Sequence, residues 1–361
     1  MKAAVLHNVG GPLVIEDVEL DEPWPNEVIV RTFGCGVCHS DLHFIDGHYG
    51  VDFPVVLGHE ASGIVESVGS DVDYVQPGDH VIACMSVFCG DCHFCSSGRP
   101  YLCMDPSVRR NESDDSRIRF NGDRITQIYE LGAFAEKMLV HESALVKIRE
   151  DMPLDRAALI GCAVTTGFGA VTNTAKVPSG ATVAVVGCGG VGLSAVNGAS
   201  IIGASQVIAL DVSEEKLDLA RKVGATHTIN VSVSDPVETV LEMSDGGVEF
   251  SFEALGRKET VEQCFEMLCP GGVATVIGMV PEGQKVEVLG SELLSEKTLQ
   301  GSNMGSNQFR IDMPYYVDLY LEGKLKLDFI HEKNIELGAI NESFQLLRDG
   351  DSGRHIVIFN S

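Results

Sequence analysis

Four of the eleven cysteines in this 361-residue chain lie within one fifteen-residue stretch, CGDCHFCSSGRPYLC, at 89–103. The spacing C-x2-C-x2-C-x7-C allows four thiolates to surround one Zn²⁺ ion and leaves no position for a substrate. A closed shell of this kind is typical of a structural metal site. Disulfide bonds and a nucleic-acid-binding zinc module are the competing interpretations. The candidate ligands are Cys89, Cys92, Cys95 and Cys103.

Further candidate ligands come from three distant segments, GCGVCHSDLH (34–43), LGHEASG (57–63) and ALIGCAVTTGFGA (158–170). Together, Cys38, His59 and Cys162 would form a Cys2His set with one open corner, which is a pattern of catalytic zinc. The residues alone do not join these three positions, because isolated cysteines and histidines are frequently core residues. The reactive centre is therefore expected outside the cysteine cluster, and its ligand set stays open at this point.

A glycine motif follows the predicted strand TVAVVG. Gly187, Gly189 and Gly192 form G-x-G-x-x-G at the start of a helical pattern, with Gly190 inside the motif. Such glycines permit a tight turn and let a pyrophosphate approach the positive N-terminus of the helix. Asp211 ends the next predicted strand, QVIALD, nineteen residues after Gly192. This context indicates a dinucleotide-binding site.

Asp211 also predicts which dinucleotide binds. A carboxylate at this position accepts hydrogen bonds from the adenosine ribose. It would repel a 2′-phosphate by about 4 kcal/mol, for unit charges about 4 Å apart at an effective dielectric constant of about 20. NAD is therefore expected in preference to NADP. The alternative is a capping aspartate with no ligand.

Two kinds of element must position these groups. Residues 1–160 contain short runs such as EVIVRTFG and ASGIVESVG, broken by Gly, Pro and Asp, which predicts a barrel-like or sandwich β domain. From ATVAVVGCGGVG onward, strands alternate with helices such as SEEKLDLARKVGA, which predicts a doubly wound parallel sheet. Two helices, MPYYVDLYLEGKL and NIELGAINESFQLLRDG, and a closing strand HIVIF are expected after residue 300. The polar segment 109–124 is expected to be a long surface loop.

The composition excludes some classes of function. The net charge is −26, and an acidic surface repels nucleic acid and anionic lipid. The chain has no run of eighteen apolar residues, so a membrane span is not expected. The N-terminus lacks a signal-peptide pattern. We therefore expect a cytoplasmic protein. Disulfides are unfavourable in that compartment, which favours metal binding for the clustered cysteines.

The ordered motifs GVCHSDLH, GHEASGIVESVG, CGDCHFCSSGRPYLC, GCAVTTGFGA, VVGCGGVG and LDVSEEK resemble those of one known family. They are similar to the zinc-containing alcohol dehydrogenases of the medium-chain dehydrogenase/reductase family, and the match spans nearly the whole chain. The resemblance implies an α/β fold in which a Rossmann NAD-binding domain is inserted into a β-rich, GroES-like catalytic domain. The implied catalytic domain comprises residues 1–163 and 300–361, and the Rossmann domain 164–299.

The same resemblance implies two zinc ions per chain, a catalytic one held by Cys38, His59 and Cys162 and a structural one held by the four clustered cysteines. Glu60 is expected to act as a transient extra ligand. The alternative for Glu60 is a structural partnership with a buried arginine. Asp41 is expected to orient the zinc-bound histidine and to raise its basicity.

Further roles are carried over from the family. Ser40 and His43 match a proton relay that runs from the alcohol through the cofactor ribose to solvent, although His43 could instead be a plain surface histidine. The other histidines, His48 among them, are expected to be structural. The implied cofactor contacts are His39 and Arg354 at the pyrophosphate, Thr166 at the nicotinamide and Lys216 at the adenosine ribose.

The implied reaction follows from charge. Hydride leaves an alkoxide more readily than a neutral alcohol, and Zn²⁺ lowers the pKa of bound water from about 15.7 to about 7. We expect reversible hydride transfer between a primary, medium-chain or aromatic alcohol and NAD. Met85, Ile128 and Tyr129 are the candidate apolar pocket residues. The long loop 104–128 resembles that of the dimeric branch of the family, so a homodimer is expected.

Three alternatives remain open. One is oxidation of a formaldehyde–thiol adduct of glutathione or mycothiol, for which Arg109 and Arg110 could hold the thiol's carboxylates. The second is oxidation of a polyol or secondary alcohol, and the third is a non-catalytic zinc- or nucleotide-binding relative. Two zinc ions per chain would favour the enzyme, and a single ion would favour a degenerate relative.

Overall fold

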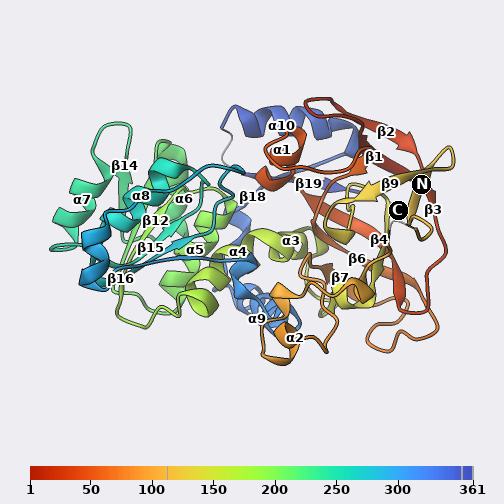
Figure 1. Ribbon diagram of the computed structural model, residues 1–361, viewed down its shortest axis with the longest axis horizontal. Helices are drawn as coiled ribbons and strands as arrows, with labels where there is room; N and C mark the ends of the chain where they lie inside the picture. Colours follow the sequence, from red (N-terminus) through yellow and green to blue (C-terminus); the bar gives the residue numbers. More distant parts are fainter. Residues whose placement is uncertain (112, 351–352, 360–361) are drawn as a thin grey trace. The chain divides into compact units, whose positions relative to one another are not determined.

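The structure, a computed structural model, describes residues 1–111, 113–350 and 353–359, and it divides into two compact units (Figure 1). Unit 1 comprises Met1–Cys162, Gln308–Leu321 and His331–Ser361, and unit 2 comprises Ala163–Asn307 and Glu322–Ile330. The unit boundaries and the expected domain boundaries differ in the C-terminal part. There, residues 300–307 and 322–330 belong to unit 2.

Unit 2 is built on a six-stranded parallel sheet with the order β14-β13-β12-β15-β16-β17. The strands are β12 (Thr182–Val186), β13 (Gln206–Asp211), β14 (His227–Asn230), β15 (Val248–Glu253), β16 (Leu268–Val276) and β17 (Thr298–Gly301). The order reverses between β12 and β15, as in a Rossmann sheet, where ligands bind at the carboxyl ends of the strands. The prediction of a doubly wound parallel sheet is confirmed.

Helices connect the parallel strands of unit 2. They are α5 (Gly190–Ile201), α6 (Glu214–Val223), α7 (Pro236–Met243) and α8 (Lys258–Glu266). The side chain of Ser213 caps α6 and that of Asp235 caps α7, so each helix begins at a residue that satisfies a free backbone N–H. The sequence analysis missed the edge strands β14 and β17, which are short and mostly not buried and so lack the apolar run of the central strands.

Unit 1 contains two sheets. One has the order β2-β1-β5-β9-β8-β3, and the other has the order β11-β7-β6-β4-β19-β18 with β10 also paired to β4. The first comprises β1 (Lys2–Leu6), β2 (Leu13–Asp17), β3 (Glu19–Leu20), β5 (Val55–Val56), β8 (Ile118–Phe120) and β9 (Asp123–Gln127). The second comprises β4 (Glu27–Gly36), β6 (Glu60–Val68), β7 (His80–Ala83), β10 (Lys137–His141), β11 (Leu145–Lys147), β18 (His331–Ile335) and β19 (Arg354–Ile358). The predicted β domain and its closing strand are therefore present.

The helices of unit 1 are α1 (His39–Ile45), α2 (His93–Ser96), α3 (Leu154–Leu159), α9 (Phe309–Leu321) and α10 (Ile340–Arg348). The segment NIELGAINES was expected to be helical throughout, but its first residues end β18 and only the part from Ile340 continues as α10. A π-helical turn, Ile160–Val164, and α4 (Thr165–Gly169) follow α3. Among the described residues, only the helical run Leu154–Thr174 is long and apolar enough to cross a membrane, and 89% of its apolar window is buried inside the protein.

The expectation of a surface loop over 109–124 is wrong for the C-terminal half of the segment. The segment contains β8 and part of β9, and it places Arg110 and Arg117 on the buried carboxylate of Glu27. Arg110 also pairs with Asp21 at 2.6 Å, and its guanidinium lies 4.5 Å from the centre of the Trp24 ring. A buried carboxylate requires such partners, so Arg110 and Arg117 point toward Glu27.

Candidate active site and metal centres

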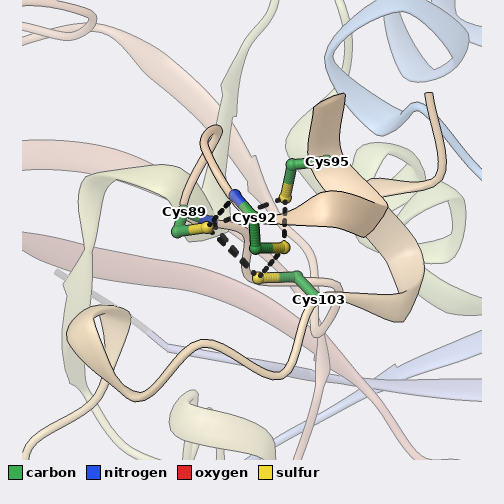
Figure 2. A group of neighbouring side chains, drawn as sticks. All are labelled: Cys89, Cys92, Cys95 and Cys103. Atoms are coloured by element: carbon green, nitrogen blue, oxygen red, sulfur yellow. Dashed lines mark hydrogen bonds between the residues drawn. The ribbon is translucent and has the colours of Figure 1, made fainter. Parts of the chain in front are cut away.

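The four clustered cysteines face one another around a common centre (Figure 2). Their sulfur–sulfur distances are 3.9 Å for Cys89–Cys95, 3.5 Å for Cys92–Cys95, 3.8 Å for Cys92–Cys103 and 3.7 Å for Cys89–Cys103. A tetrahedral ion with metal–sulfur bonds of about 2.3 Å has sulfur–sulfur edges of about 3.8 Å. A disulfide would need about 2.05 Å. The donor set therefore fits a closed Zn²⁺ shell.

Backbone groups support negative charge on these sulfurs. The Cys92 N–H donates to the Cys89 sulfur at 3.3 Å, and the Cys89 N–H donates to the Cys103 sulfur at 3.4 Å. A hydrogen bond from the Cys95 N–H, joined by bonds from the other thiols, lowers the pKa of Cys92 to about 7. Thiolates are the form that binds metal, so the local chain geometry prepares the lobe for a cation.

A second group, Cys38, His59 and Cys162, brings its three ligand atoms within 4.8 Å of one another. All three residues are buried, and His59 has no exposed surface. They come from segments separated by 21 and 103 positions in the sequence, and all lie in unit 1. The structure thus joins the three residues that sequence spacing alone could not join, although zinc binding at them remains an inference.

Local backbone features place these ligands. Cys38 precedes α1, just after β4. Gly58 has φ +91°, and a β-carbon there would lie 2.7 Å from the Phe134 backbone nitrogen, so only glycine permits the turn that leads into His59. Cys162 lies in the π-helical turn Ile160–Val164, a wider turn that often occurs at functional sites.

His59 provides the test of metal binding. Its Nδ1 lies 3.2 Å from Asp41 Oδ1, and Asp41 is held in turn by the Gly58 N–H at 2.9 Å. Its Nε2 is buried and has no hydrogen-bond partner among the described residues. A buried ring nitrogen without a partner is costly unless an ion ligates it. The buried group therefore fits a cation held by His59 Nε2 and two sulfurs.

The electrostatics of the group agree with this fit. A hydrogen bond from Cys162 holds the pKa of Cys38 well below its usual value, which favours the thiolate. Burial lowers the pKa of His59, but the charge and hydrogen bond of Asp41, together with the negative charge of Cys38, outweigh it and raise that pKa overall. A second proton on His59 is thus stabilised by the same carboxylate that would stabilise a bound cation.

Glu60 lies beside this group. Its carboxylate is 3.6 Å from Arg354 Nε, and Arg354 donates to the Val37 carbonyl at 3.0 Å. Gly36 lies opposite Glu60 in the β4–β6 pair, and a β-carbon at Gly36 would be 2.8 Å from the Glu60 carboxyl carbon. The expected pairing of Glu60 with a buried arginine is thus present in the structure, and the pyrophosphate role of Arg354 stays a prediction.

The relay candidates lie on α1. Ser40 Oγ is 3.6 Å from the Cys38 sulfur, and His39 is exposed at the first position of the helix. His43 is half-buried, and its Nδ1 lies 3.0 Å from His48 Nδ1. Burial, followed by the charge of His48, lowers the pKa of His43 below its usual value. A neutral His43 is available to accept a proton at neutral pH.

An aromatic ring packs against His59, one of the three candidate ligands. The Tyr129 ring meets the rings of His59 and Phe44 edge to face, with centroids 5.5 and 5.6 Å apart. The Tyr129 backbone is left-handed, with φ 52°, and Glu130 beside it pairs with Arg117 at 2.8 Å. The other pocket candidates, Met85 and Ile128, belong to the same core cluster as Tyr129.

The glycine motif in unit 2 has the geometry of a dinucleotide loop. Gly187 has φ +95°, and a β-carbon on Gly192 would lie 1.7 Å from the Gly187 carbonyl oxygen. A side chain on Gly189 would enter open space, and no side chain caps the N-terminus of α5, which begins at Gly190. The turn therefore leaves room for a pyrophosphate at free backbone N–H groups.

Asp211, the candidate ribose contact, lies at the end of β13 beside this loop. It accepts hydrogen bonds from the Cys188 N–H at 2.8 Å and the Ser213 N–H at 3.0 Å, which leaves lone pairs for a ribose. Lys216 lies in the first turn of α6, where its N–H meets the Ser213 hydroxyl at 3.4 Å. Thr166 is buried and its hydroxyl donates to the Met304 sulfur at 3.3 Å. The nicotinamide role of Thr166 remains a prediction.

Comparison with known proteins identifies the family. Residues 24–150 match the alcohol dehydrogenase GroES-like domain, and residues 190–322 match the zinc-binding dehydrogenase domain. Alcohol dehydrogenase class-3 from Zea mays is 39% identical over 360 residues, with 97% of this chain and 94% of that protein covered. The chain is an oxidoreductase of the zinc-containing alcohol dehydrogenases in the medium-chain dehydrogenase/reductase family.

Two solved structures are similar over almost the whole chain. Benzyl alcohol dehydrogenase from Acinetobacter calcoaceticus has a TM-score of 0.93 and 34% identity, with 99% of each chain covered. An alcohol dehydrogenase zinc-binding domain protein from Burkholderia ambifaria has a TM-score of 0.95 and 32% identity, with 100% of this chain and 99% of that chain covered. These similarities confirm the expected fold, a GroES-like domain with a Rossmann-type parallel sheet.

Sequence reasoning missed two features of the site. It did not predict that His48, which it read as structural, contacts His43. It also left Arg117 unassigned, although Arg117 forms an ion pair with Glu130, the residue next to Tyr129. The signal for His48 was present, because glycine after a helix often turns the chain back onto the last helical turn, and Gly47 has this position after α1.

Proposed function

We propose that the protein catalyses reversible hydride transfer between a primary, medium-chain or aromatic alcohol and NAD, giving the aldehyde. The observation that carries this proposal is the buried Cys38–His59–Cys162 set, in which His59 Nε2 has no partner among the described residues. Zinc bound there would act as a Lewis acid that acidifies an alcohol or polarises a carbonyl. The four-cysteine lobe would hold a second, structural ion.

The chain's own residues divide the remaining work. Asp41 holds the His59 ring, and Ser40 lies next to Cys38, where it can accept the substrate hydroxyl's proton. His43 is three residues further along α1, so it lies on the same face of the helix and can hold the proton on its way outward. Tyr129 excludes water from the side of His59.

Three observations support NAD as the cofactor. They are the open space at Gly189, the uncapped start of α5 and the carboxylate of Asp211. Steady-state kinetics with both cofactors tests the choice. We expect a higher kcat/KM with NAD, and Asp211→Asn should narrow the difference because it removes the charge that repels a 2′-phosphate. Asp235→Asn, at the cap of α7, is the matched control. Equal or better efficiency of the wild-type enzyme with NADP would contradict the proposal.

The preference for an apolar primary alcohol rests on Tyr129, Met85 and Ile128 and on the similarity to a benzyl alcohol dehydrogenase. The thiol-adduct alternative needs cations to hold the adduct's carboxylates. Arg110 is already engaged by Asp21 and Glu27, which weakens that alternative.

A substrate panel separates these candidates. Benzyl alcohol, aliphatic primary alcohols, a secondary alcohol and S-hydroxymethyl glutathione are compared by NADH absorbance. We expect the highest kcat/KM for benzyl or medium-chain alcohols, and Tyr129→Ala should reduce it more for benzyl alcohol than for ethanol. Phe33→Ala, on β4, is a control because Phe33 is exposed. A preference for the glutathione adduct would favour the alternative.

We also propose that the enzyme is a homodimer that associates through unit 2. Strand β17 is the edge of the parallel sheet, so one row of its backbone groups is available for pairing. Just before β17, Leu289 and Leu294 are 64% and 89% exposed, and a second copy packed along this edge would cover them. Leu294→Glu should yield monomers in light scattering, and an unchanged mass would contradict this interface.

A further inference from the structure

We propose that His48 is the exit of the proton path, so that a proton carried by His43 passes directly to His48 and from there to solvent. The inference rests on the proposed function, because His43 must first receive the proton. It assigns a catalytic role in proton transfer to a histidine that sequence reasoning treated as structural.

The end of α1 brings the two rings together. The helix α1 ends at Ile45 with Asp46 as its C-cap, and Gly47 follows with φ +74°. The Gly47 N–H donates to the Phe44 carbonyl at 3.2 Å, and the His48 N–H donates to the His43 carbonyl at 2.9 Å. These two bonds define a Schellman motif, in which a left-handed glycine turns the chain back onto the last helical turn. His48 therefore returns to the turn that carries His43.

The turn at Gly47 also packs against a neighbouring segment. A β-carbon on Gly47 would lie 2.7 Å from Val9 Cγ1, and the Gly10 N–H donates to the Ile45 carbonyl beside it. The segment around Val9 thus packs against the turn and fixes its path. The backbone turn at Gly47 therefore fixes the position of His48, and only the side-chain rotamer of His48 remains to be set.

The contact between the rings suits proton transfer. His43 Nδ1 and His48 Nδ1 lie 3.0 Å apart, and the ring centroids are 5.3 Å apart. Such a contact is a hydrogen bond only when one Nδ1 carries a proton and the other offers a lone pair. The structure therefore couples the tautomers of the two rings through one shared proton.

The transfer balances atom by atom. A proton binds to Nε2 of His43, the nitrogen that the contact with His48 does not use. The Nδ1–H bond of His43 then breaks as an Nδ1–H bond forms on His48, and His48 releases its Nε2 proton to water. The pair has the same charge before and after the transfer. Each ring ends as the other neutral tautomer and returns through exchange with solvent.

Burial and charge give the path its direction. His43 is half-buried, whereas His48 is exposed, so a proton gains hydration on moving outward. The titratable groups that face the pair among the described residues are Cys38, Asp46 and Tyr49, and Asp46 is paired with Arg348 of α10 at 2.6 Å. Burial, followed by the charge of His48, lowers the pKa of His43, so a proton on His48 disfavours a simultaneous proton on His43.

The test compares His43→Ala, His48→Ala and the double variant in alcohol oxidation across pH at low buffer concentration. His48→Ala should lower kcat about threefold or more near neutral pH and less at alkaline pH, where hydroxide replaces the histidine. Added imidazole should restore the lost rate. The double variant should be no slower than His43→Ala, because both residues lie on one path. His7→Ala, another partly exposed histidine of unit 1, is the matched control.

The outcomes separate the two proposals. If His43→Ala changes the pH profile and His48→Ala does not, the relay stands and the exit through His48 is wrong. If His43→Ala leaves the profile unchanged, both the relay and its extension fail. Equal losses from His48→Ala in the wild-type and His43→Ala backgrounds would also overturn the inference. Unchanged melting temperature and NAD affinity of the His48 variant exclude a folding defect as the cause.

Discussion

The two cysteine clusters of unit 1 are built in opposite ways. The lobe takes four sulfurs from one stretch of fifteen residues, and its cysteines are partly exposed. The buried group takes two sulfurs and one imidazole from three distant segments, and all three residues are inaccessible to solvent or nearly so. Both arrangements suit zinc, but only the buried group has fewer than four ligands and therefore leaves a position for a substrate.

The comparison teaches that a closed site and an open site need different support. The lobe supports itself, because backbone N–H groups of its own loop stabilise its sulfurs. The buried group depends on the fold, because Asp41 orients His59 and Gly58 permits the turn before it. A defect in the lobe should therefore affect stability first, and a defect in the buried group should affect chemistry first.

The largest expected effect tests the buried group. Cys38→Ala removes one of three ligands, so we expect turnover to fall below detection and one zinc ion per chain to be lost. NADH absorbance and elemental analysis measure the two quantities on the same sample. Cys269→Ala, a partly exposed cysteine outside both clusters, should retain two zinc ions and full activity. Activity in the Cys38 variant would exclude the proposed ligand set.

The next effect tests the lobe. Cys103→Ser opens the four-sulfur shell, so we expect the loss of one zinc ion and a melting temperature lower by about 5–10 °C, because metal binding contributes folding free energy. The kcat of the protein that remains folded at low temperature should stay close to the wild-type value. Calorimetry and kinetics at one low temperature check both statements. Loss of chemistry without loss of stability would reverse the roles of the two clusters.

The same contrast explains how much the sequence could predict. The clustering of the four lobe cysteines was predictable, because they are local and their spacing is visible in the chain. Residue types alone left Cys38, His59 and Cys162 apart, because their proximity depends on β4, β6 and the turn after α3 coming together. Resemblance to a known family supplied that grouping, and the fold then placed the three residues within 4.8 Å.

Sequence reasoning missed other features for physical reasons. The segment with Arg110 and Arg117 was expected to be a solvated loop, because charged residues in a polar segment usually face water. In the structure both arginines pair with the buried Glu27. The contact of His48 with His43 depends on a left-handed turn at Gly47, whose consequence appears only when the helix end is known. The central strands of unit 2 were predictable, because parallel strands buried on both faces have continuous apolar runs.

An intermediate effect tests how much the buried group depends on its neighbours. Asp41→Asn keeps the size of the side chain but removes the charge that orients His59 and raises its basicity. Changes of this kind lower activity or metal affinity about 10–100-fold. Competition with a chromogenic zinc chelator would measure the affinity. Asp17→Asn is a control, since Asp17 pairs only at the surface with Lys2. An unchanged affinity would mean that the buried ligands hold the ion without help from Asp41.

The smallest expected effect is a difference in reactivity among the cysteine thiols. In protein stripped of zinc, iodoacetamide should label Cys92 first, because its thiolate forms as the pH rises through about 7 rather than near its usual pKa. Cys38 also favours the thiolate, yet its burial should make it slow to react. Labelling followed by mass spectrometry at several pH values gives the order, and zinc should protect the four lobe cysteines together.

Equal labelling of all four lobe cysteines in the stripped protein would contradict this prediction. It would show that the lobe loses its geometry without metal, so that its own backbone does not prepare the sulfurs. Rapid labelling of Cys38 would contradict the burial on which the contrast between the two clusters depends.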